Sequence, residues 1–289
     1  RFGLYSGAIA DARLGDLAGA PAPLQRKLIE KRWQYLFVAT PDVMLSMAVI
    51  DCGYLSSGIC AVFDRGGRRL LVDENPVLPP LCAQVGEEPA DGMSARLLGP
   101  RIDARLQRAQ GRISVKAKWS HAEVDLVLDA ARAPRPLSAV AKVGVAGRFD
   151  FTQKTALVPA EGEVRAGNIR FPVRGQLAGL DYTHGLLARE TAWRWAFATG
   201  RCGSRPVAFN FSEGFLQGEG ENAVWIDGEP QAAGPVSFAF QPEGYRAQDV
   251  DLKLIRSRYL QPFGTFSGRL HGVAVEGLAG VTEDHAARW

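Results

Sequence analysis

The chain has 289 residues, 46% of them hydrophobic and 22% charged, and its 34 basic and 31 acidic side chains give a formal charge of +3. This composition is typical of a globular protein with a substantial core, and a charge so close to balance does not indicate a nucleic-acid partner. No apolar run approaches the roughly 20 residues that a membrane-spanning helix needs, so we expect no transmembrane segment.

Short runs of alternating apolar and polar residues, separated by glycine, predict β-strands throughout the first half of the chain. These strands cover residues 33–40, 43–52, 58–64, 68–73, 94–98, 102–109, 112–119 and 122–130. A helix is predicted over residues 23–32, where apolar residues recur at helical spacing behind Pro23. Gly66 and Gly67 predict a hairpin turn between two of the strands, because glycine adopts the positive φ that such turns require.

The second half of the chain has the same character. Its predicted strands cover residues 137–143, 162–164, 168–172, 176–182, 193–199, 206–212, 222–226, 229–232, 236–240, 245–250, 251–258, 260–267 and 270–275. Residues 183–191 are expected to form either a short helix or a loop, and residues 283–289 a last helical turn. Asp227 and Gly228 predict a second hairpin.

The spacing of the strands, about ten residues with turn residues between them, is typical of an all-β sandwich or barrel. A loose midpoint divides the chain into residues 1–150 and 151–289, and each part has enough strands for one small antiparallel barrel. We therefore predict an all-β protein with two domains and few short helices.

The cysteines and histidines are dispersed. Cys52, Cys60, Cys82 and Cys202 form no CxxC pair, and no zinc-ligand spacing is present. We predict reduced thiols, with a cross-hairpin disulfide between Cys52 and Cys60 as the alternative, and we expect no metal site and no cofactor. Phosphate-binding and dinucleotide-binding glycine motifs are absent from the sequence as well.

The densest group of polar and aromatic side chains begins at Asp181. A strand over residues 176–182 would place Asp181 and Tyr182 on opposite faces and His184 on the turn that follows. The carboxyl group and the imidazole would then share a hydrogen bond, and a carboxyl in a dry pocket stays protonated and acts as a general acid. Asp181 and His184 are therefore predicted as catalytic residues and Tyr182 as a ligand contact. The competing interpretation is that Asp181 caps a turn with His184 as its partner.

Two tryptophans follow, separated by one arginine. In a strand Trp193 and Trp195 share one face while Arg194 occupies the other. Indole rings that line a cavity hold a polyene or stabilise a carbocation through their π faces, so both are predicted as ligand contacts. The alternative is ordinary core packing. Arg194 is predicted either to bind a ligand carboxylate or to form a structural ion pair.

A further polar and aromatic group surrounds Glu221. In a strand Glu221 and Trp225 share one face, which offers an acid and a ring to one cavity, while Asn222 lies on the opposite face. We predict Glu221 as a catalytic residue, and Asn222 and Trp225 as ligand contacts. Asn210 is expected to orient a water or a ligand carbonyl. Lys154 lies in apolar strand sequence and is either paired with a buried acid or acts on the ligand itself.

Several motifs together resemble a bacterial family of uncharacterised proteins. They are the segments 31–35 (KRWQY), 51–54 (DCGY), 151–154 (FTQK), 181–185 (DYTHG), 193–196 (WRWA), 210–215 (NFSEGF) and 221–228 (ENAVWIDG). That family is distantly similar to calycin-like proteins with two lipocalin-like barrels in tandem, among them carotenoid 1,2-hydratases and other terpenoid-modifying enzymes. The resemblance covers essentially the whole chain and implies a lipophilic ligand, but it assigns no catalytic residue.

Three functions remain open on the sequence. The first is binding of a hydrophobic small molecule such as a lipid, an isoprenoid or a polyketide. The second adds metal-independent acid–base chemistry on that molecule, of the hydratase, isomerase or cyclase type. The third is a carbohydrate-binding or glycoside-cleaving β-sandwich, since paired carboxyls beside tryptophan also suit sugars. A cytoplasmic location is expected, with a periplasmic one as the alternative because the chain begins at Arg1 and a leader could have been removed.

Overall fold

The computed structural model describes residues 3–14, 21–143, 148–214, 216, 220–234, 236–253 and 255–289. Phe215 and Leu254, which fall within a sequence motif and a predicted strand, lie outside these ranges. The chain is 70% strand and 3% helix, which confirms the all-β prediction. None of the described residues forms a helix long and apolar enough to cross a membrane.

The first sheet has 14 strands. Its main path runs β5 (Arg69–Glu74), β4 (Ser56–Asp64), β3 (Val43–Asp51), β2 (Glu30–Ala39), β14 (Ile169–Leu186), β13 (Phe149–Ala166), β11 (Ala122–Asp129), β10 (Arg112–Lys118), β9 (Ile102–Ala109), β8 (Ser94–Gly99) and β7 (Ala83–Val85). Off this path, β1 (Gly3–Ser6) pairs with β12 (Leu137–Lys142), β12 pairs with β13, and β6 (Val77–Leu78) pairs with β4. The sheet curls until β7 and β8 contact β3 and β4, and it encloses an apolar core.

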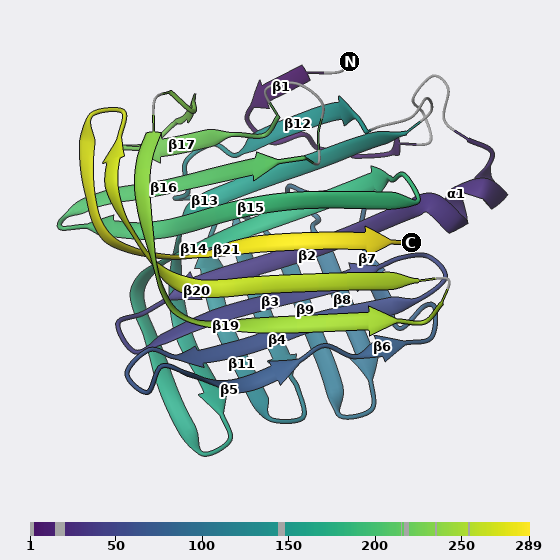
Figure 1. Cartoon of the computed structure of the whole chain (residues 1–289), viewed down its shortest axis with the longest axis horizontal. Helices are drawn as coiled ribbons and strands as arrows, with labels where there is room; N and C mark the ends of the chain where they lie inside the picture. The colour runs from purple at the N-terminus through teal and green to yellow at the C-terminus, as the bar shows by residue number, and fades with distance from the viewer. Residues whose placement is uncertain are drawn as a thin grey trace.

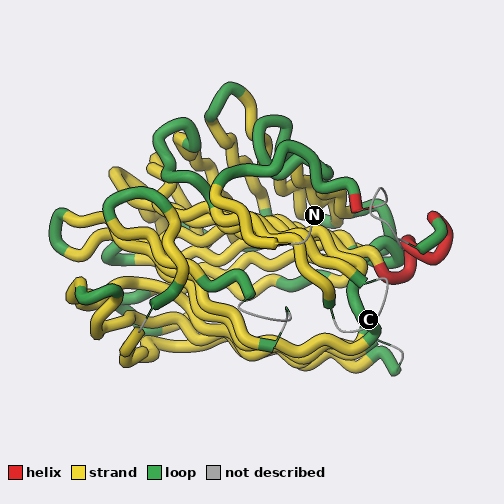
Figure 2. Tube along the Cα trace, turned by 90° about the horizontal axis from the view of Figure 1, so that it is seen from above, coloured by secondary structure: helices red, strands yellow, loops and turns green. Residues whose placement is uncertain are grey.

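The second sheet has seven strands and lies across the outer face of the first (Figures 1 and 2). Its order is β18 (Pro230–Ala232), β17 (Ala223–Ile226), β16 (Arg205–Glu213), β15 (Glu190–Cys202), β21 (Val273–Arg288), β20 (Arg256–Leu270) and β19 (Val236–Asp251). The one α-helix among the described residues, α1 (Pro23–Ile29), leads directly into β2.

The strands between the two layers are buried on both faces, and their sequences reflect it. In β2, Leu36 and Val38 point into the core of the curled sheet, whereas Tyr35 and Phe37 point to the second sheet. The same division explains why β3 and β4 are almost continuously apolar, whereas β10 alternates between buried and half-buried or exposed residues.

Three local predictions were wrong. The helix ends at Ile29 rather than at residue 32, because the next residues pair with the end of β14. Residues 183–186 continue β14 instead of forming a helix or loop, and residues 283–288 belong to β21 instead of a helical turn. Residues 283–288 of β21 are hydrogen-bonded to β15 on one side, and most of them also to β20 on the other, and this pairing holds them in a strand. The alternate residues Glu283 and His285 face the space between the two sheets.

The chain crosses from the first sheet to the second only once, and the domain boundary at residue 150 stays a prediction. β13 and β14 have 18 residues each and belong to the first sheet, so the chain passes to the second sheet between Leu186 and Glu190. The hairpins predicted at Gly66 and at Asp227 are both present. All four cysteines are free thiols, as expected.

The two sheets approach each other closely at Gly179 of β14. A Cβ atom at this position would lie 2.1 Å from Cζ of Phe197 in β15. We expect Gly179→Ala to lower the free energy of unfolding by about 1–3 kcal/mol, because overpacking displaces the facing ring. Thermal or urea denaturation measures the loss.

Gly66→Ala is the matched control, because Gly66 lies in an exposed turn and the nearest atom to an added Cβ is 3.6 Å away. Its effect should stay within about 0.5 kcal/mol of the wild type. Equal stability of the two variants would contradict the close approach at Gly179.

Candidate functional site

A cavity of about 160 Å³ lies between the two sheets. Its aromatic lining comes from both layers and consists of Trp33, Tyr35, Trp193, Trp195, Tyr259 and Trp289. Aliphatic side chains from β3, β4 and β19 line it as well, and at its outer end Leu252, beyond the last residue of β19, is 53% exposed. The cavity is therefore an aromatic pocket that opens beside the turn between β19 and β20.

Side chains two residues apart in a strand share one face, and this brings rings of β2 and β15 opposite each other in the pocket. Trp33 and Tyr35 share one face of β2, and Trp193 and Trp195 share one face of β15, as the sequence predicts. Trp33 stacks on Trp193 with ring centroids 6.1 Å apart, and Tyr35 meets Trp195 edge-on at 5.3 Å. These two pairs fix the separation of the sheets at the cavity.

Lys154 joins two predicted catalytic acids in the wall of the cavity. Its Nζ lies 2.7 Å from a carboxylate oxygen of Asp181, which is its cross-strand neighbour in β14, and 3.1 Å from one of Glu221. Thr152 donates a further hydrogen bond to Asp181 at 3.4 Å. All three ionisable side chains are buried and line the cavity. The pairing of Lys154 with an acid follows one of the two alternatives left by the sequence.

Burial governs the protonation of this cluster. It raises the pKa of Asp181 above the ordinary value for an aspartate, although Lys154 acts in the opposite direction. Burial alone would lower the pKa of Lys154, but the charges of Asp181 and Glu221 outweigh it and raise that pKa. The ammonium group is thus held in its charged form.

Glu283 is a third acid in the cavity, and sequence reasoning missed it. It accepts hydrogen bonds from Nε1 of Trp193 at 2.8 Å and from the hydroxyl of Tyr259 at 2.9 Å. Burial raises its pKa from 4.5 to about 7, against the effect of these two hydrogen bonds. Glu283 therefore exchanges its proton near neutral pH. The alternation of apolar and polar residues along residues 281–287 could have predicted a strand with Glu283 on its inner face. The expectation of a helical turn there prevented that prediction.

His285 stands next to Glu283 on the same face of β21. Its Nε2 is hydrogen-bonded to the hydroxyl of Ser257 at 2.9 Å, and its ring meets Trp193 edge-on at 4.3 Å. Burial, with a smaller contribution from Arg246, lowers the pKa of His285 to about 3. The imidazole is therefore neutral and serves as a polar part of the cavity wall.

Asn210 lies behind the cavity and supports two of its residues. Its Oδ1 accepts the hydrogen bond of Trp195 Nε1 at 2.7 Å, and its Nδ2 donates to the backbone oxygen of Glu221 at 2.8 Å. Both contacts are buried. Asn210 thus orients the indole of Trp195 and the backbone of Glu221. On the sequence alone we expected it to orient a water or a ligand carbonyl.

Arg194, Asn222 and Trp225 lie away from this cavity. Arg194 occupies the outer face of β15 with its side chain 73% exposed, near Glu213 and Asp284. Asn222 accepts a hydrogen bond from the backbone of Ser212 at 2.6 Å and borders a separate groove on that outer face. Trp225 is fully buried and donates to a backbone oxygen at 3.1 Å, so it packs in the core.

The structure places Asp181 and His184 on opposite faces of the first sheet. Both residues belong to β14 and are three positions apart, so their side chains point to opposite faces of the strand. Asp181 faces the cavity, and His184 faces the inner side of the curled sheet. Tyr182 shares the inner side and donates its hydroxyl to the backbone oxygen of Gly86 at 2.8 Å. The shared hydrogen bond expected between Asp181 and His184 is therefore absent.

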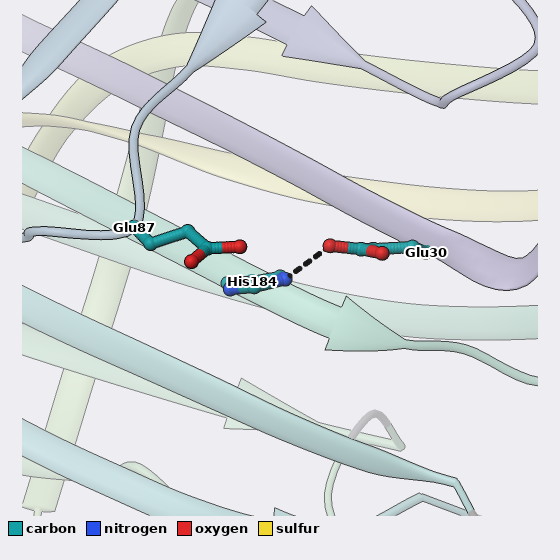
Figure 3. Close-up of side chains that lie close together, drawn as sticks. All are labelled: Glu30, Glu87 and His184. Carbon is teal, nitrogen blue, oxygen red and sulfur yellow. Dashed lines mark hydrogen bonds and ion pairs between the residues drawn. The ribbon is translucent and has the colours of Figure 1, made fainter. Parts of the chain in front are cut away.

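His184 belongs instead to a second polar cluster with Glu30 and Glu87 (Figure 3). Nε2 of His184 lies 2.7 Å from Glu30, and Arg32 contacts all three residues, with Nη2 2.7 Å from Glu87. Burial raises the pKa of Glu30, but the hydrogen bonds from His184 and Arg32 outweigh it and lower that pKa to about 2. The guanidinium already provides the positive charge that a bound cation would bring, so these residues form an ion-pair network.

The fold is shared over the whole chain with solved structures of low sequence identity. A structure assigned as AttH (NE1406) from Nitrosomonas europaea has a TM-score of 0.52 at 10% identity and covers 96% of this chain and 99% of its own. CghA solved with Sch210972 has a TM-score of 0.56 at 11% identity and covers 99% of this chain and 98% of its own. Kievitone hydratase from Nectria haematococca gives 0.45 at 9% identity, with 98% and 97% covered. Among curated proteins, no sequence matches this chain.

The structure and its likeness to AttH define an all-β protein built from a curled half-barrel sheet and a second sheet packed against it. The chain belongs to the family described as Domain of unknown function (DUF2804), whose profile matches residues 1–245 and 229–289. The resemblance to an uncharacterised family, based on the sequence motifs, is thus confirmed.

Removing Lys154 tests the buried cluster. Lys154→Met leaves Asp181 and Glu221 without their cation, and we expect the free energy of unfolding at pH 7 to fall by about 3–5 kcal/mol. Adding Asp181→Asn and Glu221→Gln should restore part of the loss, because the uncompensated charges are then gone. Lys116→Met breaks an exposed pair with Asp125 and should cost less than about 1 kcal/mol. A small effect at Lys154, equal to that at Lys116, would contradict the buried ion pair.

The pKa of Glu283 predicts a pH-dependent stability. Since this pKa is raised in the folded protein, the folded state holds the proton more tightly than the unfolded state. The resulting stabilisation is complete below about pH 4.5 and is lost as pH rises through about 7, by up to about 3 kcal/mol. The free energy of unfolding of the wild type should therefore fall relative to that of Glu283→Gln over this range. A constant difference between the two proteins would show that Glu283 has an ordinary pKa.

Proposed function

We propose that this protein binds a small lipophilic molecule in the cavity between its sheets and performs acid–base chemistry on it. The observation that carries the proposal is a largely aromatic cavity that contains Glu283, a carboxyl group whose pKa is about 7. Titratable groups with strongly shifted pKa values in an apolar pocket are typical of catalytic sites.

The size and lining of the cavity support a lipophilic ligand. An apolar cavity of about 150 Å³ holds a molecule such as benzene, so a cavity of about 160 Å³ accepts a ring or a short branched chain. The opening near Leu252 leaves room for a tail to extend outward. CghA, which has the same fold along its whole length, was solved with Sch210972, and this supports ligand binding by such an arrangement of sheets.

The acids of the cavity support a reaction that begins with proton transfer. Protonated Glu283 would donate to a carbon atom of a double bond, and the π faces of Trp193 and Trp195 would stabilise the positive charge that develops. In a hydration, a water oxygen then bonds to the cation and its proton passes to Asp181 or Glu221. In an isomerisation, the same carboxylates remove a proton from the neighbouring carbon. Both reactions leave the enzyme to exchange one proton with solvent.

The geometry favours this function over recognition of a carbohydrate. A glycosidase needs two carboxyls about 5–10 Å apart that flank a sugar in an accessible groove. Among the described residues, the paired carboxyls Asp181 and Glu221 are instead buried, and Lys154 holds both. A sugar would also leave most of its hydroxyl groups without partners against the aromatic walls.

Filling the cavity tests ligand binding. Ile50 lines the cavity from β3, so Ile50→Trp should displace the ligand because the larger ring takes its space. Native mass spectrometry of freshly purified wild type, followed by organic extraction, should release a lipophilic compound that Ile50→Trp lacks. Val127→Trp, at an exposed position of β11, is the matched control and should retain the compound. An empty wild type that also binds no hydrophobic fluorescent probe would refute the proposal.

Substituting the acid tests the chemistry. Glu283→Gln keeps the size of the side chain but cannot donate a carboxyl proton, so we expect it to accumulate unconverted substrate. The compound extracted from this variant should differ from that of the wild type by one water for a hydratase, or be its isomer. Asp284→Asn changes the neighbouring exposed residue and should yield the wild-type compound. Identical compounds from Glu283→Gln and wild type would limit the function to binding.

A further inference from the structure

A hydrogen-bonded pair of polar side chains, Ser257 of β20 and His285 of β21, lies in the wall of the cavity. Oγ of Ser257 is 2.9 Å from Nε2 of His285. The reaction proposed above uses neither side chain. Three aromatic rings surround the imidazole, with centroid distances of 4.3 Å to Trp193, 5.2 Å to Tyr259 and 6.3 Å to Trp289. The pair is therefore a small polar site among aromatic walls.

The hydrogen bond between Ser257 and His285 leaves part of their hydrogen-bonding capacity unused. Among the described residues, Nδ1 of His285 has no hydrogen-bond partner, and it does not belong to the fully buried polar atoms that lack one. The Ser257 hydroxyl has one proton and two lone pairs, and its contact with Nε2 uses only one of these three. Both side chains line the cavity, so their unused donors and acceptors are available to a molecule inside it.

The pair offers one donor and one acceptor in either of its tautomers. When the Ser257 hydroxyl donates to Nε2, the imidazole proton is on Nδ1, which donates, and the oxygen of Ser257 still accepts. When Nε2 donates to Ser257, the hydroxyl proton is free to donate and Nδ1 accepts. Burial lowers the pKa of His285 to about 3, so the imidazole is neutral at pH 7 in both arrangements. The site therefore complements a neutral group that donates and accepts at once.

Gln248 adds a second group of this kind at the same depth of the cavity. It is the cross-strand neighbour of Tyr259, which is in turn the neighbour of His285, so the three residues form one row across the second sheet. Gln248 lines the cavity, and its amide has no hydrogen-bond partner among the described residues. An amide also carries donors and an acceptor. The row thus has two polar sites with the same preference.

The chemistry of these sites distinguishes between ligand groups. A hydrocarbon would leave both the donors and the acceptors unpaired, which is costly inside an apolar cavity. A carbonyl or a carboxylate only accepts, so it would leave the acceptors of the row unused. A hydroxyl group has one proton and two lone pairs, and it pairs with a donor and an acceptor together.

We propose that Ser257 and His285 bind a hydroxyl group of the ligand, so that the ligand is a lipophilic alcohol or phenol. This inference rests on the proposed function and names the class of ligand for the same cavity. The hydroxyl donates to one member of the pair and accepts from the other. Glu283 lies two residues further along β21 from the end of the strand at Arg288, which is roughly 7 Å in a strand. The hydrocarbon part beyond the hydroxyl therefore extends toward the acid proposed to move the proton.

The test compares the affinities of wild type and Ser257→Ala for three probes of similar size: ethylbenzene, benzyl alcohol and benzaldehyde. Benzyl alcohol has a hydroxyl in place of the methyl group of ethylbenzene, whereas the oxygen of benzaldehyde only accepts. Each probe is compared with itself in the two proteins, so differences in their hydration cancel. We expect Ser257→Ala to weaken binding of benzyl alcohol roughly fivefold to fiftyfold, as for the loss of one or two hydrogen bonds. Binding of ethylbenzene should change less than about twofold, and benzaldehyde should lose less than benzyl alcohol.

A matched variant and a second measurement complete the test. Ser237→Ala is the control, because Ser237 is exposed in β19 and does not line the cavity, and it should leave all three affinities at their wild-type values. In the wild type, the imidazole ¹⁵N signals of His285 should move more with benzyl alcohol than with ethylbenzene, which carries the same ring. Where Ser257→Ala fails to fold, this difference decides the question.

The outcomes separate this inference from the proposed function. If the wild type binds none of the three probes, both fail. If ethylbenzene binds but Ser257→Ala leaves the affinity for benzyl alcohol unchanged, the cavity binds lipophilic molecules and the pair does not hold a hydroxyl. Equal losses for benzaldehyde and benzyl alcohol would also overturn the inference, because the pair would then act only as a donor.

Discussion

Aromatic pairs across the space between the two sheets hold this molecule together. Phe63 stacks on Phe263 with centroids 5.2 Å apart, and Phe37 meets Phe197 edge-on at 6.2 Å. Such pairs contribute beyond the area that they bury. They lie beyond the inner end of the cavity, so the sheets are closely packed there and separate only where Tyr35 and the tryptophans line the space. The position of the cavity therefore follows from where this packing ends.

The same packing imposes a cost on every polar group that it encloses. Lys154, Arg246, Asp181 and Glu221 are buried and Glu283 is half-buried, and each needs a partner to compensate for lost hydration. Lys154 obtains two carboxylates and is satisfied. Glu283 has only uncharged donors, so burial raises its pKa to about 7. A reactive acid is thus a consequence of the place where the two sheets enclose it.

The sequence predicts the class of fold and part of the site. Alternation and glycine turns indicate the strands, and the period of two places Trp193 and Trp195 on one face. Lys154 could be expected to pair with an acid because a charge in apolar strand sequence needs one. The error at His184 arose because the predicted strand ended four residues early. With the strand continued through residue 184, His184 lies on the face opposite to Asp181.

Glu283 and Arg246 could not be found from local sequence, because long-range pairing creates their environments. The partner Trp193 is 90 residues from Glu283, and Asp73 is 173 residues from Arg246. In the sequence Glu283 falls in a predicted helical turn and Arg246 near the start of a predicted strand, so each resembles an ordinary surface charge. Only the order β15–β21–β20–β19, laid against the first sheet, brings Glu283 to the cavity and buries Arg246 against Asp73.

A crystal soaked with bromobenzene tests most directly whether the space between the sheets accepts a lipophilic molecule. The bromine gives an anomalous signal that locates the compound whatever the natural ligand is. We expect one strong peak between β2 and β15, beside Tyr35 and Trp193. A peak confined to the inside of the curled first sheet, or no peak between the sheets, would contradict it.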